Sequence, residues 1–400
     1  MVQGNVKALY FMPVSYAARV THQAVAGDMT SKERHEARYK RRKAKREVKR
    51  QQLLSEHSFE KVTSVESLYQ AAHLASRGVS WKASTQRYMM NLLCYIYDTH
   101  VKLLNGQDIR KGFNCFDIKE RGKLRHIQSV HFSERVVQKS LCKNALIPVL
   151  THSLIYDNGA SQEGKGTHFT IRRLQKHLER HYRHHGREGG ILLLDFHDYF
   201  GQIDHDKLKE IIDKAFDDER LKQLTYLFID AFDHGLGLGS EVSQVSAVSY
   251  PNRIDHFIKE ALRIHGYARF MDDSYLIHED IRYLEKCLEI LKKIYKSYGI
   301  QLNENKTRIC DLKHGFSFMK TRFYITKSGH IVKKPSREAI TRQRRKLKKQ
   351  AGLVNEGRMT FEQVHTSYAS WKGSMMYRDA HRTTQEMDKL FNKLFIENWR

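Results

Sequence analysis

The sequence is poor in proline and cysteine, and it contains no long apolar run. Four prolines in 400 residues favour one compact, interlocked body over domains joined by flexible linkers. The five cysteines lie far apart and form no Cys-x-x-Cys pair, so we expect reduced core thiols in a cytoplasmic protein. No stretch approaches the ~20 apolar residues of a membrane span, so we expect no membrane partner.

Acidic residues are too few to balance the basic ones. Lys and Arg number 70 against 45 Asp and Glu, which gives a formal net charge of +25. Such an excess repels itself unless a polyanion shares the surface, and this favours a nucleic-acid-binding protein. The segment KERHEARYKRRKAKREVKRQQ (32–52) dominates a basic N-terminal extension, residues 1–60, which is either a phosphate-tracking arm or a disordered tail.

The rest of the chain mixes helix and strand patterns, which indicates an α+β fold. The runs GILLLDFHDYF (190–200) and YARFMDDSYLI (267–277) each predict a buried strand. ERVVQKSLCKNALIPVLTHSLI (134–155) predicts a long buried helix, and IRYLEKCLEILKKIYKSYG (281–299) predicts an amphipathic one. The segment after Pro335 is basic and predicts a helical bundle.

Three aspartates stand beside the two predicted strands. Asp195 ends one apolar run, and Asp272 and Asp273 open a turn in the other. Crowded carboxylates raise one another's pKa unless a cation shares them. Hard oxygen ligands in an open site suit Mg²⁺, and two ions about 3.5–4 Å apart can activate a hydroxyl and stabilise a leaving phosphate oxygen. The pattern therefore predicts two Mg²⁺ ions with a triphosphate substrate.

Histidines recur at a four-residue spacing in KHLERHYRHHG. His177, His181 and His185 fall on one face of a helix, where a zinc site is one interpretation. A solvated helix end that faces phosphate is the interpretation we favour.

Six motifs occur in an order that resembles the reverse transcriptase family. RFMDD resembles its (Y/F)xDD motif, and LLLDFHDYFGQIDHDKL resembles the acid motif before it. HGLGLGSEVSQVSAVSYPNRIDHFIKE (234–260) resembles the Gly-rich loop and helix between them. KERGKLRHIQSVHFSERVVQKSL and IYDNGASQEGKGTH (155–168) resemble fingers segments, and YGIQLNENKTRI (298–309) resembles the lysine-bearing segment. The resemblance covers roughly residues 113–330.

The resemblance implies an α+β right-hand polymerase. Its parts would be fingers at 61–190, a palm with part of the fingers at 191–330, and an α-helical thumb at 331–400. The palm would hold an antiparallel sheet packed on helices. The implied activity is RNA-directed DNA synthesis from dNTPs.

The resemblance also implies a role for each site residue. Asp195 and Asp272 would ligate both metal ions, with Asp273 assisting and the Phe196 carbonyl completing the shell. Phe200 would be a steric gate that rejects the 2′-hydroxyl of ribonucleotides. The remaining residues would bind nucleotide (Lys123, Arg125, Gly239, Gln244 and Lys306) or the RNA–DNA duplex (Arg345, Lys346, Lys348 and Lys349).

Departures from the family pattern suggest a subtype. Leu238 replaces a common Gln, and Ser243–Gln244 replaces Ser-Pro; both resemble enzymes of diversity-generating retroelements and of bacterial antiphage defence. Lys320 stands at the expected Gly of the primer grip. Since nothing after residue 335 resembles a ribonuclease H or an integrase, we expect a compact enzyme. Its partner would be a structured, co-encoded non-coding RNA, with or without an accessory protein.

Other functions stay open at this stage. A catalytically silent RNA-binding scaffold is opposed by the retained aspartates, because a scaffold has no need of crowded acids. RNA synthesis is opposed by Phe200. Template-independent or protein-primed DNA synthesis stays open, since 20 tyrosines offer no way to choose a primer. The oligomeric state is not indicated by the sequence.

Overall fold

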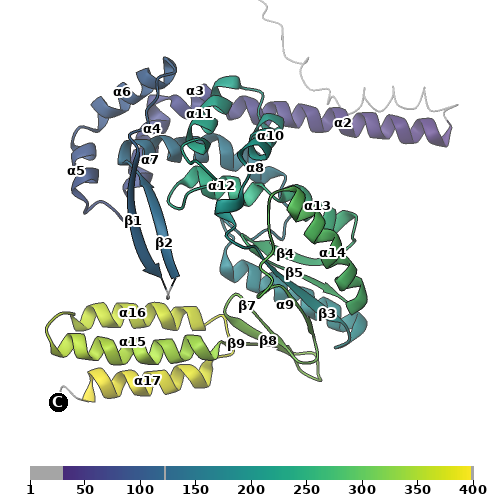
Figure 1. Cartoon of the computed structure of the whole chain (residues 1–400), viewed down its shortest axis with the longest axis vertical. Coiled ribbons are helices and arrows are strands. Elements are labelled where there is room, and N and C mark those ends of the chain that lie inside the picture. The colour runs from purple at the N-terminus through teal and green to yellow at the C-terminus, as the bar shows by residue number, and fades with distance from the viewer. Residues whose placement is uncertain (1–29, 121–122, 398–400) are drawn as a thin grey trace, which may run out of the picture. The chain divides into compact units, whose positions relative to one another are not determined.

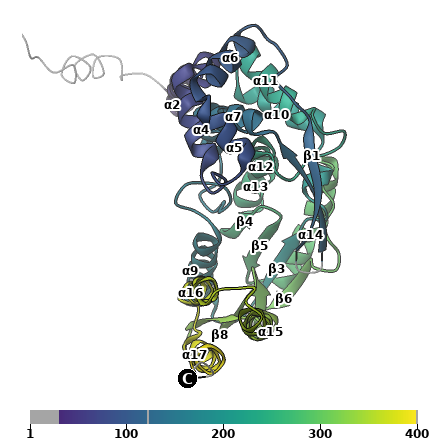
Figure 2. The same ribbon diagram turned by 90° about the vertical axis from the view of Figure 1, so that its left-hand side faces the viewer.

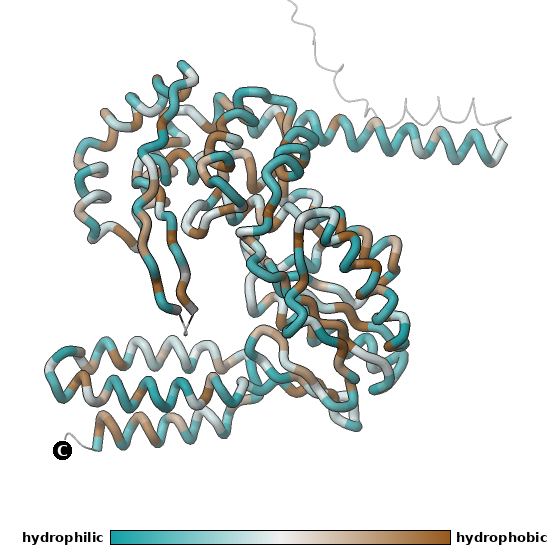
Figure 3. The backbone as a smooth tube through the Cα atoms, viewed as in Figure 1, coloured by the Kyte–Doolittle hydropathy of each residue, from teal (hydrophilic) through white to brown (hydrophobic). Residues whose placement is uncertain are grey.

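The computed structural model describes residues 30–120 and 123–397, apart from the side chains of Glu120, Lys123 and Arg125. The chain divides into two units, Met1–Glu56 and His57–Arg400. The described part of the first unit is essentially one helix, α2 (Ser31–Glu56), which has no buried residue. Its surface is almost uniformly hydrophilic (Figure 3), so local pairs such as Lys40–Glu36 (2.9 Å) support it rather than packing. Residues 1–29 of the predicted extension lie outside the described residues.

The second unit begins with a helical group followed by a long hairpin (Figure 1). Its elements are α3 (Phe59–Thr63), α4 (Val65–Ser76), α5 (Ala83–Met90), α6 (Leu92–Leu104), β1 (Phe113–Glu120) and β2 (Lys123–Val130). The two strands pair antiparallel from Phe113 opposite Val130 to Glu120 opposite Lys123.

The helix predicted over 134–155 is confirmed as helical but is not one regular helix. It consists of α7 (Phe132–Leu141), the π-turn η1 (Cys142–Leu146) and α8 (Ile147–His152). Pro148 has no N–H to donate to the carbonyl of Asn144, so the helical ladder cannot continue there. The ring Nδ1 of His57 lies 2.7 Å from that carbonyl and takes the missing place.

The central sheet has four antiparallel strands in the order β4-β5-β3-β6. They are β3 (Gly190–Asp195), β4 (Gly266–Phe270), β5 (Asp273–His278) and β6 (Arg308–Asp311). The run 267–277 therefore forms two strands rather than one, and the turn predicted at Asp272 and Asp273 lies one residue earlier, at Met271 and Asp272. The expected antiparallel sheet packed on helices is confirmed: α9 (Thr167–His185) contacts β4 and β5, and α14 (Ile281–Ser297) contacts β3, β5 and β6.

Between β3 and β4 the chain forms a second helical group (Figure 1). It consists of η2 (Phe200–Gln202), α10 (His205–Ala215), α11 (Glu219–Ile229), α12 (Glu241–Ser249) and α13 (Asn252–Glu260). One side chain ties this group to the strands: the Tyr199 hydroxyl, buried just before η2, donates to the carbonyl of Ala247 in α12 at 2.5 Å.

A small sheet and three helices complete the second unit. The sheet is β7 (Phe316–Phe318), β8 (Thr321–Ile325) and β9 (Ile331–Pro335), and the helices are α15 (Arg337–Asn355), α16 (Phe361–Met375) and α17 (His381–Phe395). Figure 2 looks along the axes of these helices, which pack around Leu347, Val364 and Phe391. The expected helical bundle at the C-terminus is confirmed. None of the described helices is long and apolar enough to cross a bilayer.

Lys320, the departure noted in the β7–β8 turn, adopts a left-handed backbone. Its φ is +60°, and that of Met319 before it is +47°. Two such residues in succession suit a two-residue hairpin turn, a position where glycine or asparagine is usual. The turn geometry is thus retained without the glycine.

Beneath the sheet, His177 of α9 is buried in a polar network. Its Nδ1 lies 3.0 Å from the Tyr275 hydroxyl, and Asp157, Arg173 and Lys259 surround its other side. Burial first, and then the neighbouring cations, lower the pKa of His177 from 6.5 to about 4, although Asp157 opposes this.

We therefore expect the free energy of unfolding to fall as pH drops from 6.5 to 4. Between these pH values His177 is protonated in the unfolded chain but stays neutral in the folded chain. This difference lowers the free energy of unfolding by up to about 3 kcal/mol. Urea unfolding between these pH values should show a shallower pH slope for His177→Gln than for the exposed control His381→Gln. Equal slopes for the two variants would contradict the role given to His177.

Candidate active site

Two of the predicted aspartates lie directly opposite each other in the central sheet. Asp195 is the last residue of β3, Asp273 is the first of β5, and the antiparallel register pairs them. Side chains alternate along a strand, so Asp195 shares a face with the buried Ile191 and Leu193. Asp195 is only 6% exposed, which is unusual for a carboxylate without a compensating cation.

The turn that carries Asp272 is held by a buried arginine. Met271 has a left-handed φ of +54°, and its carbonyl accepts a hydrogen bond from Arg269 Nη1 at 3.2 Å. The Arg269 guanidinium also forks onto Asp255 of α13 at 2.8–3.0 Å, and both side chains are fully buried. The turn is therefore anchored to α13 through this ion pair.

Backbone contacts fix the segment that follows Asp195. The Phe196 N–H donates to the Asp272 carbonyl at 3.3 Å, and the Asn303 N–H donates to the Asp195 carbonyl at 2.8 Å. The Phe196 side chain is buried against the rings of Tyr199 and Tyr295. The structure thus places the main chain of Phe196 beside Asp272, as its predicted role as a carbonyl ligand requires.

Lys306 contacts a catalytic candidate directly. Its ammonium donates to both carboxylate oxygens of Asp195, at 2.8 and 2.6 Å. Partial desolvation lowers the pKa of Lys306, but the hydrogen bond and charge of Asp195 outweigh it and the pKa is raised. The sequence analysis expected Lys306 to bind nucleotide; in the structure its ammonium compensates the charge of Asp195, and its role toward nucleotide stays a prediction.

The chemistry of this donor set fits a divalent cation. Burial, and then the carboxylates of Asp272 and Asp195, raise the pKa of Asp273 from 3.8 to about 7. A cation shared by these groups would remove that penalty. Within the described residues no three His, Cys, Asp or Glu side chains already converge on one metal position, and Lys306 lies against Asp195. Asp195, Asp272 and Asp273 would hold the metal, which supplies charge stabilisation for phosphoryl transfer.

Phe200, five residues after Asp195, has its backbone against the Gly-rich loop. Its carbonyl accepts from the Leu236 N–H at 2.7 Å, and a Cβ on Gly235 would stand 2.5 Å from that carbonyl. Gly235 is therefore required for the close approach of the loop to this backbone. The Phe200 side chain is half-buried and its ring meets Tyr199 edge-on at 5.9 Å.

The other predicted nucleotide contacts are distributed over the loop and the hairpin. Gly239 has a φ of +115°, and a Cβ there would lie 3.1 Å from the Gln128 carbonyl of β2. Gln244 is exposed on α12. Lys123 and Arg125 belong to β2, but their side chains lie outside the described residues. These four roles stay predictions.

The predicted duplex-binding residues occupy exposed positions on α15. Of Arg345, Lys346, Lys348 and Lys349, Lys346 is bonded to the Ser367 hydroxyl at 2.6 Å. The buried face of the same helix carries Gln343, Leu347 and Gln350. The basic face of α15 is thus open, and its nucleic-acid role stays a prediction.

Replacing Phe200 with Ala should weaken discrimination against ribonucleotides. The half-buried ring can exclude a 2′-hydroxyl by bulk, and steric selectivity of this kind is worth about tenfold to a hundredfold. Primer extension with rNTPs and dNTPs should show the rNTP/dNTP ratio of kcat/KM rising by that amount. Phe116→Ala, at an exposed ring of β1, is the control. An unchanged ratio would remove the gate assignment.

Carboxylates from two neighbouring antiparallel strands, beside a Gly-rich loop and above two helices, define the palm of a nucleotidyl-transferring polymerase. Residues 111–323 match the family model described as reverse transcriptase (RNA-dependent DNA polymerase). This match covers more than half of the chain, so the chain belongs to the reverse transcriptase family. No curated protein sequence matches it.

Solved telomerase structures are similar in fold. Telomerase from Candida albicans in complex with a TWJ fragment of telomeric RNA is 12% identical, with a TM-score of 0.45, and the match covers 60% of this chain and 50% of that one. Apo telomerase from Candida tropicalis, truncated from its C-terminal domain, is 14% identical with a TM-score of 0.44, covering 55% and 54%. The chain thus spans about half the length of the structures it matches.

Sequence reasoning missed the structural role of Arg269. The signal was available: an arginine within an otherwise apolar strand must find a buried partner. Asp255 lies within the segment 234–260 that was matched to the family, but its contact with Arg269 depends on how α13 crosses β4, which the sequence alone does not show.

Proposed function

We propose that this reverse transcriptase copies a dedicated structured RNA into cDNA with two Mg²⁺ ions, in a bacterial antiphage defence system or a diversity-generating retroelement. The observation that supports it best is the pairing of Asp195 with Asp273, whose pKa is raised to about 7 by burial and by the neighbouring carboxylates. Crowding buried carboxylates in this way lowers the stability of the fold. Chemistry that depends on a bound cation would explain why the chain keeps them together.

In this proposal the chain's own residues perform three tasks. Asp195, Asp272 and Asp273 would hold the metal ions, which would supply charge stabilisation for phosphoryl transfer. The ring of Phe200 selects the sugar. Lys306, whose ammonium contacts Asp195, would bind the phosphates of the substrate. The +25 charge suits an RNA larger than the template–primer duplex.

A catalytically silent RNA-binding scaffold is the second candidate. One observation favours it: the Lys306 ammonium already satisfies Asp195 without any metal. Under that function the lysine would stay in place and no nucleotide would be transferred.

One experiment separates the two. The protein is purified from cells that carry its native locus, bound RNA is sequenced, and DNA made with Mg²⁺ and dNTPs is sequenced beside that of Asp272→Ala/Asp273→Ala. DNA copied from the bound RNA, absent in the double variant, supports the polymerase. RNA bound equally by both, with no DNA under any priming condition, supports the scaffold.

A further inference from the structure

A row of unpaired cations runs along one face of α9. Lys176, Arg180 and Arg183 are exposed, and within the described residues none of them forms an ion pair with a carboxylate. Their spacing of four and three residues places them on one helical face, at rises of roughly 6 and 4.5 Å. Three like charges at that spacing repel one another unless an anion lies across them.

The row lines a pocket of about 550 Å³ together with Asp157, Arg173 and Lys259, and Glu179 is the second carboxylate of its lining. Asp157, whose side chain is 8% exposed, holds the Arg173 guanidinium through its Nε and the Lys259 ammonium at 2.8 Å. One carboxylate thus positions two further cations, so the pocket carries an excess of positive charge on a rigid base.

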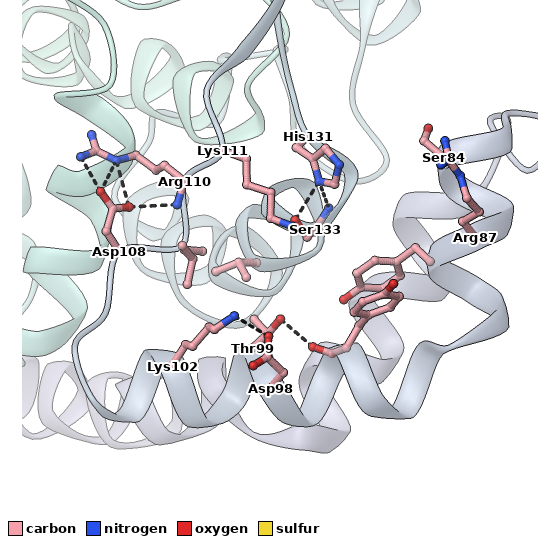
Figure 4. A pocket seen from close by; sticks show the side chains of 14 residues that line it. Ser84, Arg87, Asp98, Thr99, Lys102, Asp108, Arg110, Lys111, His131 and Ser133 are labelled. Carbon is pink, nitrogen blue, oxygen red and sulfur yellow. Dashed lines mark hydrogen bonds and ion pairs between the residues drawn. The ribbon is translucent and has the colours of Figure 1, made fainter.

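Another pocket in the same chain shows the contrast. A cavity of about 400 Å³ lies between α5, α6 and the start of α7, and it too is lined by basic residues (Figure 4). There Arg110 forks onto Asp108 at 2.8–3.1 Å, and Lys102 binds Asp98 at 2.6 Å. Two of the four Lys and Arg side chains that line that cavity are paired with carboxylates, whereas none of the three cations of the α9 row is, within the described residues.

The α9 row lies away from the catalytic aspartates. The helix ends beside Glu188, whose carbonyl contacts His181 Nε2 at 2.7 Å, just before β3 begins. In the register of the sheet, Gly190 pairs with His278 at that end, and Asp195 pairs with Asp273 at the other. Five residues of strand separate the ends by roughly 17 Å. A ligand on the C-terminal half of α9 is therefore not the reacting nucleotide.

We infer that the exposed face of α9, centred on Lys176, Arg180 and Arg183, binds the phosphodiester backbone of a structured RNA at a site separate from the catalytic cleft. The row spans too great a length for a single phosphate, and Arg binds phosphate oxygens in a forked geometry. This inference deepens the proposed function. It rests on the proposed function for one point, the identity of the RNA that is bound.

The test compares two triple charge reversals of equal size. Lys176→Glu/Arg180→Glu/Arg183→Glu alters the α9 face. Lys286→Glu/Lys293→Glu/Lys296→Glu alters three exposed lysines of α14 that likewise form no ion pair within the described residues. Both change the net charge equally, so long-range attraction falls equally, and thermal unfolding checks that both remain folded.

The probe is an RNA hairpin of about 16 base pairs, titrated at several salt concentrations. We expect the α9 variant to bind at least about tenfold more weakly than the α14 variant. The slope of log K against log salt should also be shallower by about 2 to 3, one for each lost phosphate contact. Equal affinities and slopes would overturn the inference.

Two further arms make the outcomes distinguishable. Inorganic phosphate at constant ionic strength should not displace the hairpin; if it does so at millimolar concentration, the site takes a small anion and the RNA inference fails. Extension of a short DNA primer on an RNA template should be equal for wild type and both variants. If wild type and both variants fail to extend the primer, while only the α9 variant loses hairpin binding, the proposed function is wrong and the RNA site on α9 is supported.

Discussion

Asp195→Asn and Asp273→Asn should each lower kcat for dNTP incorporation by about a thousandfold or more, while the fold is retained. Each substitution removes a negative oxygen from the place where a divalent cation would be shared. Such a cation supplies several kcal/mol of transition-state charge stabilisation, and about 4 kcal/mol corresponds to a thousandfold in rate. Primer extension with Mg²⁺ under single-turnover conditions measures the loss.

The matched control is Asp311→Asn. Asp311 ends β6 and pairs with Gly190 at the opposite end of the same sheet, where it accepts a hydrogen bond from the Lys313 N–H at 2.7 Å. Asp311→Asn removes the same charge from the same sheet, but at a position outside the candidate active site. A loss of activity as large in Asp311→Asn would show that sheet integrity, rather than the paired carboxylates, limits the rate.

Asp273→Asn carries an additional structural signature. Because burial and two neighbouring carboxylates penalise its charged form, removing that charge should leave stability in metal-free buffer unchanged or slightly raised. If Asp273 serves catalysis, Asp273→Asn should have reduced activity and undiminished stability. If Asp273 were purely structural, the variant should lose stability and keep its activity.

The central strand and its aspartate could be predicted from sequence because the local pattern is complete. The run 190–195 is a short apolar stretch bounded by glycines, and tertiary packing did not override it. A turn was predicted at Asp272 and Asp273, but its exact position, Met271–Asp272, could not be predicted, because methionine is not a residue that favours tight turns. The side chain of Arg269 and the register of β5 against β3 impose that turn, and both are long-range contacts.

The contacts of the functional side chains were least predictable. Lys306 was recognised by its motif, but its contact with Asp195 depends on the Phe196–Leu302 bridge, which brings the segment around residue 303 beside the end of β3. Gly235 belongs to the Gly-rich loop that was recognised from the sequence, yet the atoms it must approach belong to Phe200 and Gly201. A motif fixes which residue types occur, whereas their neighbours are decided by how separate elements cross.

Removing either partner of the buried Arg269–Asp255 pair should lower the free energy of unfolding by about 3–5 kcal/mol, because the remaining charge is left uncompensated in the interior. Both side chains are fully buried, and the Asp255 carboxylate also accepts from the Tyr267 hydroxyl at 2.5 Å. Urea unfolding of Arg269→Met and Asp255→Leu measures the effect. Arg344→Met, at an exposed pair with Glu386, should cost no more than about 1 kcal/mol.

The double variant Arg269→Met/Asp255→Leu should recover part of the stability but not the activity. Without the carboxylate no buried charge is left uncompensated, so the two costs should not add. The carbonyls of Val248 and Met271 nevertheless both lose the guanidinium that binds them, at 2.7 and 3.2 Å. The turn that carries Asp272 then has no anchor to α12 or α13. A double variant with wild-type stability and wild-type activity would show that β4 and β5 position the aspartates unaided. A folded but slow double variant would assign that task to Arg269.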